Sequence, residues 1–398
     1  MGKLSNYRKL YLFVIILIIN IILHSYVSAQ DNLNLNQMLT QVDTNNMLLS
    51  DSYYIWGSSV VKGKDGKYHM FFSRWAHGKR NLDDDSMNYI FNGFKGWLKY
   101  SEIAYAVSDN LTGPYKIQGT VLKGNGNPEH WDRFTYHNPQ VRCFNGKCYL
   151  YYISNSYNPY FDVNSQLSKE DLHWLRYNCT QKIGVAIADS PEDFIKGNFT
   201  KLDQPLISPD GVNTFEIVNN PSVTQGPDDK YYMIFKSRMP NVGNMTLWIA
   251  VSDKPDGQFK LLSKVFTEPD MACEDPCLWY DYKLKRFYAA VKYYSNSKKL
   301  ISQFGGIALI TSLNATNWEA AKNPLISKRQ LLLKNNTMLE LSNLERPFVY
   351  TDANGQPLAI FAAFSVNNPG KVKPENYTPE YNTGNVGILL KNITKNKK

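Results

Sequence analysis

The chain has 398 residues, of which 43% are hydrophobic and 14% are aromatic, enough to bury a substantial core in one large domain or in two. Its formal net charge of +9 includes three basic residues near the start and several in the tail, so the positive excess on the rest is mild. This balance permits an anionic substrate without requiring one, and no pattern typical of a nucleic-acid-binding module is present.

Residues 1–29 have the pattern of a secretory signal peptide. Three basic residues precede an apolar run over residues 10–23, and small residues before Ala29 offer a cleavage site. An uncleaved membrane anchor is the alternative for a run of this length. No later segment is apolar for long enough to cross a bilayer. We therefore expect a secreted protein, extracellular or periplasmic, followed by a polar extension over residues 30–50 that forms a short helix or a strand closing the fold.

The cysteines and glycosylation sequons fit export. Cys143 and Cys148 flank an Asn-Gly turn, which predicts a disulfide across a hairpin. Cys273 and Cys277 are a weaker candidate pair, and Cys179 is left over. The spacings do not match a zinc site, because no CxxC or nearby histidine pair accompanies them. Eight N-x-T sequons would carry glycans in a host that glycosylates.

One strand–turn–strand pattern recurs along the chain and organises it. A polar element is followed by an apolar strand, a turn and an aromatic strand. The five copies are WGSSVVKGKDGKYHMFFSRW, HNPQVRCFNGKCYLYYISNS, NNPSVTQGPDDKYYMIFKSR, EDPCLWYDYKLKRFYAAVKYY and ERPFVYTDANGQPLAIFAAF. They alternate with five copies of a second pattern, a strand and a short excursion, such as EIAYAVSDNLTGPY and LWIAVSDKPDGQF.

This repeat predicts an all-β, five-bladed β-propeller over residues 51–398. Long amphipathic helical patterns are scarce after residue 50, and each repeat supplies three or four strands. A β-sandwich has no reason to repeat one pattern five times, and the repeats of a β-helix are much shorter. The alternatives are therefore weaker.

The openings of the five first strands should converge at one mouth, because the innermost strand of each blade lines the channel of a propeller. The second strands return toward the same mouth. We therefore expect one funnel that holds carboxylates, amides, a histidine, aromatic rings and several cations. The expected residues are Gly57, Ser58, His137, Asn138, Asn219, Asn220, Glu274, Asp275, Glu345 and Arg346 from the first strands, and Arg74, Trp75, Lys236, Arg238 and Lys292 from the second.

Several of these residues also have a purely structural explanation. Asn138 and Asn220 each precede a proline and could cap its turn. His137 could be a hydrogen-bonded core histidine. Glu345 and Arg346 could form a simple ion pair. We retain all five as candidates for the site because the repeat places them around one axis.

Glu274 is the strongest catalytic candidate on these grounds. It stands beside Asp275, and burying two adjacent acids is costly unless a site uses their charge. Neighbours on a regular strand point to opposite faces, so a catalytic partner of Glu274 should come from another blade. Trp56 and Trp75 are candidate platforms for a sugar ring, although ordinary core packing is the alternative for each.

The [DNE]-Pro openings, the elements SDNLTGPY and SDKPDGQF, and the EDP motif resemble the five-bladed glycoside hydrolases of families 43, 62, 32 and 117. The first copy of the repeat is most similar to the family 117 branch, and the resemblance covers roughly residues 50–390. It implies a propeller that acts on carbohydrate without a cofactor. Some relatives hold a divalent cation such as calcium on the axis, but no ligand set in this chain is compelling.

The resemblance also implies roles for individual residues. A Glu-x-Pro supplies the general acid in family 43, which assigns the acid to Glu274 and makes Glu345 its rival or partner. The first-blade position of the family's base holds Gly57 here, and the middle-blade Asp becomes Asn220. Family 117 uses a histidine as acid, which keeps His137 in view. The replacements for the missing base must come from nearby: Asp51, Glu216 or Asp275.

Three functions follow as hypotheses. The first is a secreted glycoside hydrolase that releases an exo-linked sugar by carboxylate acid/base catalysis with inversion, which needs two carboxyls roughly 6.5–9.5 Å apart. The second is a glycoside phosphorylase, since the expected cations would also bind phosphate, although export argues against it. The third is a non-catalytic carbohydrate-binding propeller, because the first-blade base is missing.

Overall fold

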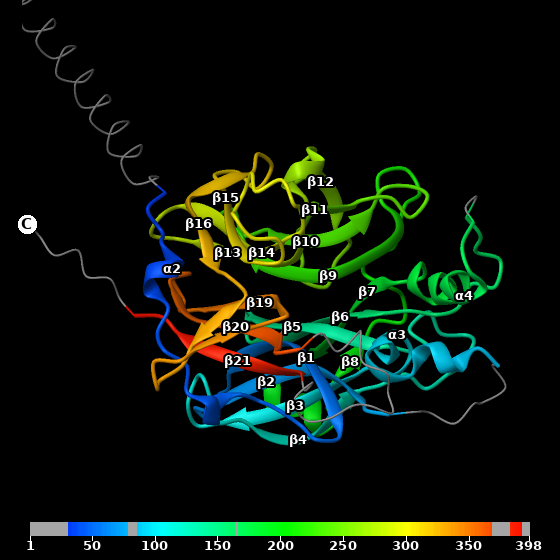
Figure 1. The fold of residues 1–398 in the computed structure, drawn as a ribbon, viewed down its shortest axis with the longest axis horizontal. Helices are drawn as coiled ribbons and strands as arrows, with labels where there is room; N and C mark the ends of the chain where they lie inside the picture. The colour runs from blue at the N-terminus through cyan, green and yellow to red at the C-terminus, as the bar shows by residue number, and fades with distance from the viewer. Residues whose placement is uncertain (1–30, 79–85, 164–165, 368–382, 392–398) are drawn as a thin grey trace, which may run out of the picture.

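The computed structural model describes residues 31–78, 86–163, 166–367 and 383–391. The expected signal peptide lies outside these ranges, as do the sequons at Asn376 and Asn392. The described strands form five blades around a central axis, and the innermost strand of each blade contacts the innermost strands of its two neighbours (Figure 1). The sequence-based prediction of a five-bladed β-propeller is confirmed.

The first four blades are four-stranded antiparallel sheets in chain order from the axis outward. Blade 1 contains β1 (Tyr53–Lys62), β2 (Tyr68–Ala76), β3 (Glu102–Ser108) and β4 (Lys116–Leu122). Blade 2 contains β5 (Tyr136–Phe144), β6 (Lys147–Ser154), β7 (Lys182–Ala188) and β8 (Thr200–Lys201). Blade 3 contains β9 (Phe215–Gln225), β10 (Tyr231–Arg238), β11 (Met245–Ser252) and β12 (Lys260–Lys264). Blade 4 contains β13 (Cys273–Asp281), β14 (Arg286–Tyr293), β15 (Ile307–Ser312) and β16 (Glu319–Ser327).

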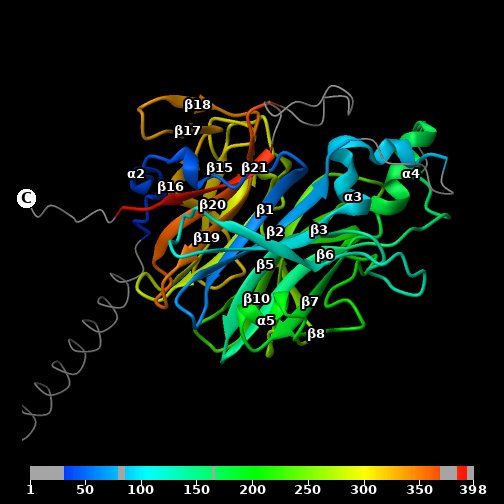
Figure 2. The same cartoon turned by 90° about the horizontal axis from the view of Figure 1, so that it is seen from below.

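Blade 5 is formed by the C-terminal part of the described chain, and the N-terminal extension packs along its edge. Its strands are β19 (Asn343–Thr351), β20 (Pro357–Ser365) and β21 (Thr383–Leu389). The N-terminal extension carries α2 (Leu35–Met38) and η1 (Thr44–Asn46), and α2 lies beside β16 (Figure 1). Leu48 and Asn385 exchange two backbone hydrogen bonds of 2.9 and 3.1 Å, so the extension lies along the edge of β21. The small hairpin of β17 (Gln330–Leu332) and β18 (Met338–Glu340) lies near α2 (Figure 2) and bridges to Val42.

Short helices occur in the connections between strands, mostly between strands of the same blade. They are η2 (Asn88–Phe91), η3 (Gly93–Gly96), α3 (Trp97–Tyr100), α4 (Lys169–Asn178), α5 (Pro191–Ile195) and η4 (Pro269–Met271). The Ser168 hydroxyl caps α4 by accepting from the backbone N–H of Asp171, which satisfies one of the donors left unpaired at a helix start. No helix within the described ranges is long and apolar enough to span a bilayer.

The core lies between neighbouring blades, because each sheet packs against two others. Strands covered on both faces read as nearly continuous apolar runs, and every residue of β14 is buried. The Asn-Gly turn between β5 and β6 pairs Cys143 with Cys148, and the predicted disulfide joins them. Cys179, Cys273 and Cys277 are free thiols, so the weaker candidate pair is not formed.

All five innermost strands carry a bulge at the same place. In each one the pairing with the second strand shifts register at the residue before proline or, in blade 1, before Ser58. Proline cannot donate to the ladder, so a bulge accommodates it, and the bulged residue takes the left-handed conformation. The left-handed residues are Gly57 (φ 36°), Asn138 (50°), Asn220 (53°), Asp275 (56°) and Arg346 (54°). The bulges therefore bring five equivalent side-chain positions to one level of the axis.

Candidate active site

A pocket of about 150 Å³ lies at the end of the axis where the bulges are, and every blade contributes to it. Its lining contains many of the residues that the repeat predicted, which are Trp56, Trp75, His137, Asn138, Asn219, Asn220, Lys236, Glu274, Asp275, Glu345 and Arg346. The remaining lining residues are Phe94, Trp97, Ile153 and Gln181. The funnel expected from the sequence is therefore present, with a partly different membership.

The five bulged residues form a polar ring at the base of the pocket. Asn138 Nδ2 donates to Asn220 Oδ1 at 2.9 Å, and Asn220 Nδ2 donates to Asp275 Oδ1 at 2.7 Å. The backbone N–H and the guanidinium of Arg346 donate to Asp275 at 3.3 and 3.5 Å. Gly57 closes the circle without a side chain. The ring holds Asp275 by hydrogen bonds from both neighbours, so its carboxylate is fixed in place.

The bulge also changes the directions of Glu274 and Asp275. Neighbours on a regular strand point to opposite faces, as the sequence analysis assumed, yet both residues line the same pocket. The left-handed backbone at Asp275 breaks the alternation, which is a known effect of bulges beside active sites. The expectation of opposite faces is therefore wrong here.

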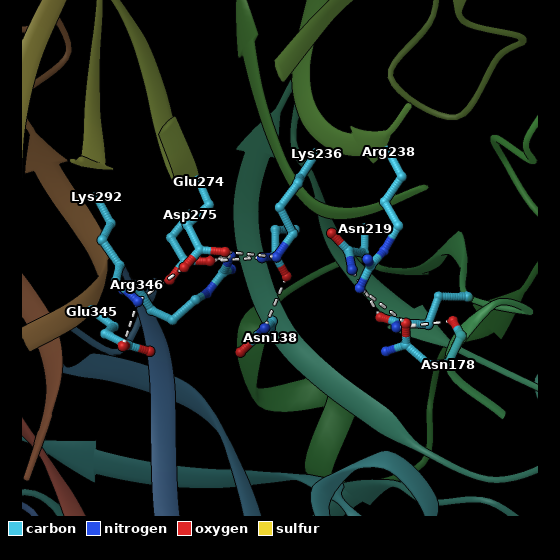
Figure 3. A network of polar contacts seen from close by, with 12 residues as sticks. Asn138, Asn178, Asn219, Lys236, Arg238, Glu274, Asp275, Lys292, Glu345 and Arg346 are labelled. Carbon is cyan, nitrogen blue, oxygen red and sulfur yellow. Dashed lines mark hydrogen bonds and ion pairs between the residues drawn. The ribbon is translucent and has the colours of Figure 1, made fainter. Parts of the chain in front are cut away.

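Glu274 lies between two lysines. Lys236 Nζ donates to one of its oxygens and Lys292 Nζ to the other, each at 2.9 Å, and all three side chains are nearly buried (Figure 3). Burial alone would raise the pKa of Glu274, but the charges of Lys236 and Lys292 hold it well below its usual range. Glu274 is thus a carboxylate at any ordinary pH.

Glu345 has the opposite tendency. Burial raises its pKa above the usual value, and the negative charges of Asp275 and Glu274 add to this against the opposing effect of Lys292. Lys292 Nζ also donates to Glu345 Oε1 at 2.5 Å. Of the carboxyl groups that line the pocket, Glu345 is the one with a raised pKa, which is the property of a general acid.

The two glutamates do not have the spacing of an inverting pair. Lys292 Nζ lies 2.9 Å from Glu274 Oε1 and 2.5 Å from Glu345 Oε1, so these two oxygens are at most about 5.4 Å apart. Inverting glycosidases separate their carboxyl groups by roughly 6.5–9.5 Å to admit a water. The Lys292 ammonium group also bridges the two oxygens. Glu274 and Glu345 therefore do not act as acid and base on opposite sides of one sugar.

His137 faces this charged group from blade 2. Its Nδ1 lies 2.8 Å from the Ser101 hydroxyl, and its ring stacks on Trp97 with centroids 4.9 Å apart. No hydrogen bond to its Nε2 is found among the described residues. Burial lowers the pKa of His137 well below its usual value, and the charges of Arg346 and Lys236 lower it further. His137 is consequently neutral at pH 7.

Aromatic rings form the wall beside His137. Trp75 meets the imidazole edge-on at 5.6 Å, and Phe94 packs edge-on against Trp56 at 5.3 Å. Phe94 and Trp97 belong to η3 and α3, between the second and third strands of blade 1. The repeat did not predict either residue because both stand outside it. The dense aromatic spacing of NGFKGWLKY, residues 92–100, was the available signal.

Three predicted cations do not line the pocket. Lys292 is one of them, although it binds Glu274 and Glu345, which do line it. Arg74 and Arg238 are the other two. Arg74 alternates with Trp75 on β2 and points to the other face of the blade, where it binds Glu102 at 2.7 Å and lies over the Tyr53 ring. Arg238 is directed toward Asn178, away from Glu274 (Figure 3). Neither lines the pocket. Both were expected there because the sequence showed strand ends but not side-chain directions.

Two candidate bases, Asp51 and Glu216, also lie outside the pocket lining. Asp51 is exposed to solvent before β1. Glu216 has a left-handed backbone, and its carboxylate accepts from the backbone N–H of Val242 at 2.7 Å. These placements leave Asp275 as the third candidate base, and the polar ring already uses its oxygens.

The axis does not suit a calcium ion. Calcium takes six to eight oxygen ligands with several carboxylates among them. The polar ring offers a single carboxylate, that of Asp275, and the Arg346 guanidinium is already beside it. In the described part of the chain, the only group of three or more His, Cys, Asp or Glu side chains close enough to share an ion lies elsewhere in the fold.

Comparisons with known proteins agree with this architecture. No family model matches the chain. The extracellular endo-alpha-(1->5)-L-arabinanase 2 of Bacillus subtilis is 22% identical in an alignment 250 residues long that covers 58% of this chain and 44% of that protein. The chain thus spans less than half the length of this curated relative.

Solved structures give the same result for the fold. The family 117 glycoside hydrolase Zg3597 of Zobellia galactanivorans is 16% identical, with a TM-score of 0.57 over 88% of this chain and 89% of that one. The alpha-L-arabinofuranosidase of Lactobacillus brevis is 13% identical, with a TM-score of 0.53 over 89% and 94%. A thermostable family 43 glycoside hydrolase is 13% identical, with a TM-score of 0.52 over 90% and 98%. The chain therefore resembles the five-bladed glycoside hydrolases of families 43 and 117 in fold, as its sequence predicted.

Proposed function

We propose that the protein is a glycoside hydrolase that removes a terminal sugar from a carbohydrate chain. The observation that carries this proposal is the axial pocket, where a carboxyl group of raised pKa and a neutral histidine share one enclosure with four aromatic side chains. Titratable pairs whose environments push their pKa values in different directions are typical of acid/base sites. Aromatic rings offer the apolar faces on which sugar rings pack.

Glu345 is the proposed general acid. Its raised pKa favours the protonated form that must donate to the leaving oxygen. Glu274 was assigned this role by the EDP motif, but two lysines hold it as a carboxylate. In our proposal the negative charge of Glu274 helps to raise the pKa of Glu345, and it also lies near the positive charge that develops on the sugar.

His137 is the proposed general base. It is neutral, its orientation is fixed by Ser101 and Trp97, and it comes from a blade that is separated from blade 5 by blade 1. A base on a different blade from Glu345 can activate a water on the other side of the sugar. We therefore propose inversion with His137 in place of the missing carboxylate. The anomer first formed, followed by NMR, distinguishes inversion from retention.

The pocket dimensions favour exo action. A volume of about 150 Å³ with aromatic rings along one wall suits one terminal residue better than an extended chain. The cations that line the pocket are paired, since Lys236 binds Glu274 and Arg346 binds Asp275. We therefore propose a neutral sugar rather than a uronic or sulfated one. The names of the arabinanase and arabinofuranosidase relatives make α-L-arabinofuranosides the first substrates to test.

We further propose that the protein is exported. The N-terminal pattern predicts a signal peptide, the Cys143–Cys148 disulfide is typical of oxidising compartments, and the curated relative is named extracellular. Mass spectrometry of the protein from its own host should show a mature N-terminus at Gln30. A retained leader would contradict cleavage.

The deciding experiment measures turnover of a panel of aryl glycosides and short oligosaccharides, with and without inorganic phosphate. We expect phosphate-independent release of the terminal sugar and loss of this release in Glu345→Gln. Sugar phosphate formed only with phosphate present would identify a phosphorylase. Saturable sugar binding without any product would identify a binding propeller. Either outcome would overturn the proposed hydrolase.

A further inference from the structure

A second cluster of chemically active side chains lies at the other end of blade 1. His69 stands near the start of β2, Asp65 in the turn before it, and Glu192 in α5 of blade 2. His69 Nε2 lies 3.0 Å from Asp65 Oδ1 and 3.4 Å from Glu192 Oε1. One ligand atom of each residue lies within 4.8 Å of the others. Six residues of strand separate His69 from Trp75, so the cluster is about 20 Å from the axial pocket.

The backbone around the cluster leaves room for these three groups to converge. A Cβ atom on Gly63 would come closer than 3.0 Å to His69 Nε2, Glu192 Oε1 and Asp65 Oδ1 at once. Any side chain at this position would push the three atoms apart. Glycine thus provides an open space at the point where they meet.

The second nitrogen of His69 is also committed. Tyr105 from β3 forms a short hydrogen bond with Nδ1 and stacks beside the imidazole. The imidazole is almost fully buried, so this contact fixes the ring with Nε2 directed at the two carboxylates. Metal-binding histidines regularly use their other nitrogen in this way, since a fixed ring keeps the lone pair on the ion.

The charge of the cluster is unbalanced. Asp65 and Glu192 can carry two negative charges, and His69 alone can supply at most one positive charge. Among the described residues no lysine or arginine forms an ion pair with either carboxylate, and the nearby Lys67 pairs with Asp109 at 3.4 Å. Glu192 Oε2 is buried without a hydrogen-bond partner in the same part of the chain. A bound cation would balance this charge, and it would also satisfy Oε2 if Glu192 bound it with both oxygens.

We propose that Asp65, His69 and Glu192 bind one divalent transition-metal ion of the zinc type and thereby join blade 1 to blade 2. Imidazole with carboxylates suits such ions better than calcium or magnesium, which prefer oxygen alone. Zinc bonds of about 2.0–2.2 Å place tetrahedral ligand atoms roughly 3.3–3.6 Å apart, close to the distances from His69 Nε2. Water completes the coordination, and the open pocket that these residues line gives the ion a path to the site.

This ion would stabilise the fold rather than take part in the reaction. It would hold the β1–β2 turn against α5, two segments that belong to different blades. The inference does not depend on the proposed glycosidase activity, because the two sites share no residue and lie at opposite ends of β2.

Calorimetric titration of the untagged, EDTA-treated protein with ZnCl₂ tests the proposal. We expect one equivalent of Zn²⁺ to bind, with a rise in Tm of about 3–4 °C when free Zn²⁺ is 100 times the Kd. His69→Gln and Glu192→Gln should abolish stoichiometric binding. Tyr105→Phe should weaken it about 10–100-fold by releasing the ring. Asp109→Asn, which alters an exposed carboxylate lining the same pocket, should leave it unchanged.

Two results would overturn the proposal. One is the absence of stoichiometric Zn²⁺ binding by the wild type, which would leave His69 as a hydrogen-bonded core residue. The other is equal binding by the wild type and His69→Gln, which would show that the ion binds elsewhere on the surface. If His69→Gln does not fold, Glu192→Gln provides the same comparison at a partly exposed position.

Discussion

Blades 1 and 2 and blades 4 and 5 build the same backbone at the axis and present opposite chemistry to the pocket. On both sides the innermost strand bulges at one left-handed residue. Blades 1 and 2 then contribute tryptophans, a phenylalanine and a neutral histidine. Blades 4 and 5 contribute two glutamates, an aspartate and an arginine. Lys292, which is not part of the lining, links the two glutamates, and the arginine binds the aspartate.

The difference between the two halves shows how a repeated fold acquires a site. The bulge is common to all blades, so the backbone alone cannot decide which blade binds and which reacts. The role of each blade depends on the side chains at two positions, the bulged residue and the residue before it. In blade 1 they are Trp56 and Gly57, and in blade 4 they are Glu274 and Asp275. We call the part of the pocket from blades 4 and 5 the charged half and the part from blades 1 and 2 the aromatic half. Changing single side chains can therefore separate the roles of the two halves.

The largest expected effect comes from the charged half. Glu345→Gln should lower kcat about 10²–10⁴-fold, because glutamine cannot donate the proton that the leaving oxygen needs. Lys292 keeps its bond to Glu274 at 2.9 Å, so the fold should persist. Turnover of the terminal sugar measures the loss. Glu340→Gln, an exposed glutamate on β18, is the control and should retain full activity. Equal activity of both variants would remove Glu345 from the reaction.

The second effect concerns stability. Glu274→Ala leaves Lys236 and part of the charge of Lys292 buried without a partner, which should lower the free energy of unfolding by about 3–5 kcal/mol. Urea denaturation measures this. The control is Asp270→Ala, which breaks the exposed pair with Lys299 and should cost less than about 1 kcal/mol. A similar loss of unfolding free energy in both variants would mean that the buried ion pairs of Glu274 stabilise the fold no more than an exposed surface pair does.

The third effect lies where the two halves meet. Gly57→Ala adds a Cβ at φ 36°, only 2.7 Å from Asn138 Oδ1, so both backbone strain and a clash oppose it. We expect a loss of about 1–3 kcal/mol in the free energy of unfolding. Gly66→Ala is the matched control, because its φ is 81° but nothing lies within 4 Å of the added atom. The difference between the variants measures the clash with the ring.

The repeat predicted the fold well because each strand and turn is determined by residues that are close together in the sequence. Each blade reuses one order of polar opening, apolar strand, turn and aromatic strand, and the Asn-Gly turn with flanking cysteines predicted the disulfide. The polar ring could also be anticipated, since four of its five members stand before proline at equivalent positions of the repeat. These features depend on residues close together in the sequence.

The chemistry of the site was harder to predict because it depends on direction and on partners from other blades. Side chains on β2 point alternately to the two faces of the blade, so Arg74 points away from the pocket. At the bulge this alternation is broken, and Glu274 and Asp275 both line the pocket. The sequence pointed to Glu274 as the acid, but its two lysine partners come from β10 and β14. Trp97 came from an insertion that no repeat predicted.

The smallest expected effect tests the neutral histidine of the aromatic half through the pH dependence of stability. Its folded pKa is lowered by burial, so the unfolded chain binds more protons between that value and about 6.5, and stability falls as the pH drops below 6.5. His137→Gln should remove about 1.4 kcal/mol of the loss seen between pH 7.5 and 5.5, measured by urea denaturation at both values. His77, whose pKa burial also lowers, remains in both proteins and cancels. His130→Gln, at an exposed position, should keep the wild-type slope. If the free energy of unfolding of His137→Gln depended on pH as in the wild type, His137 would be protonated in the folded state. The aromatic half would then carry a positive charge and would not be neutral.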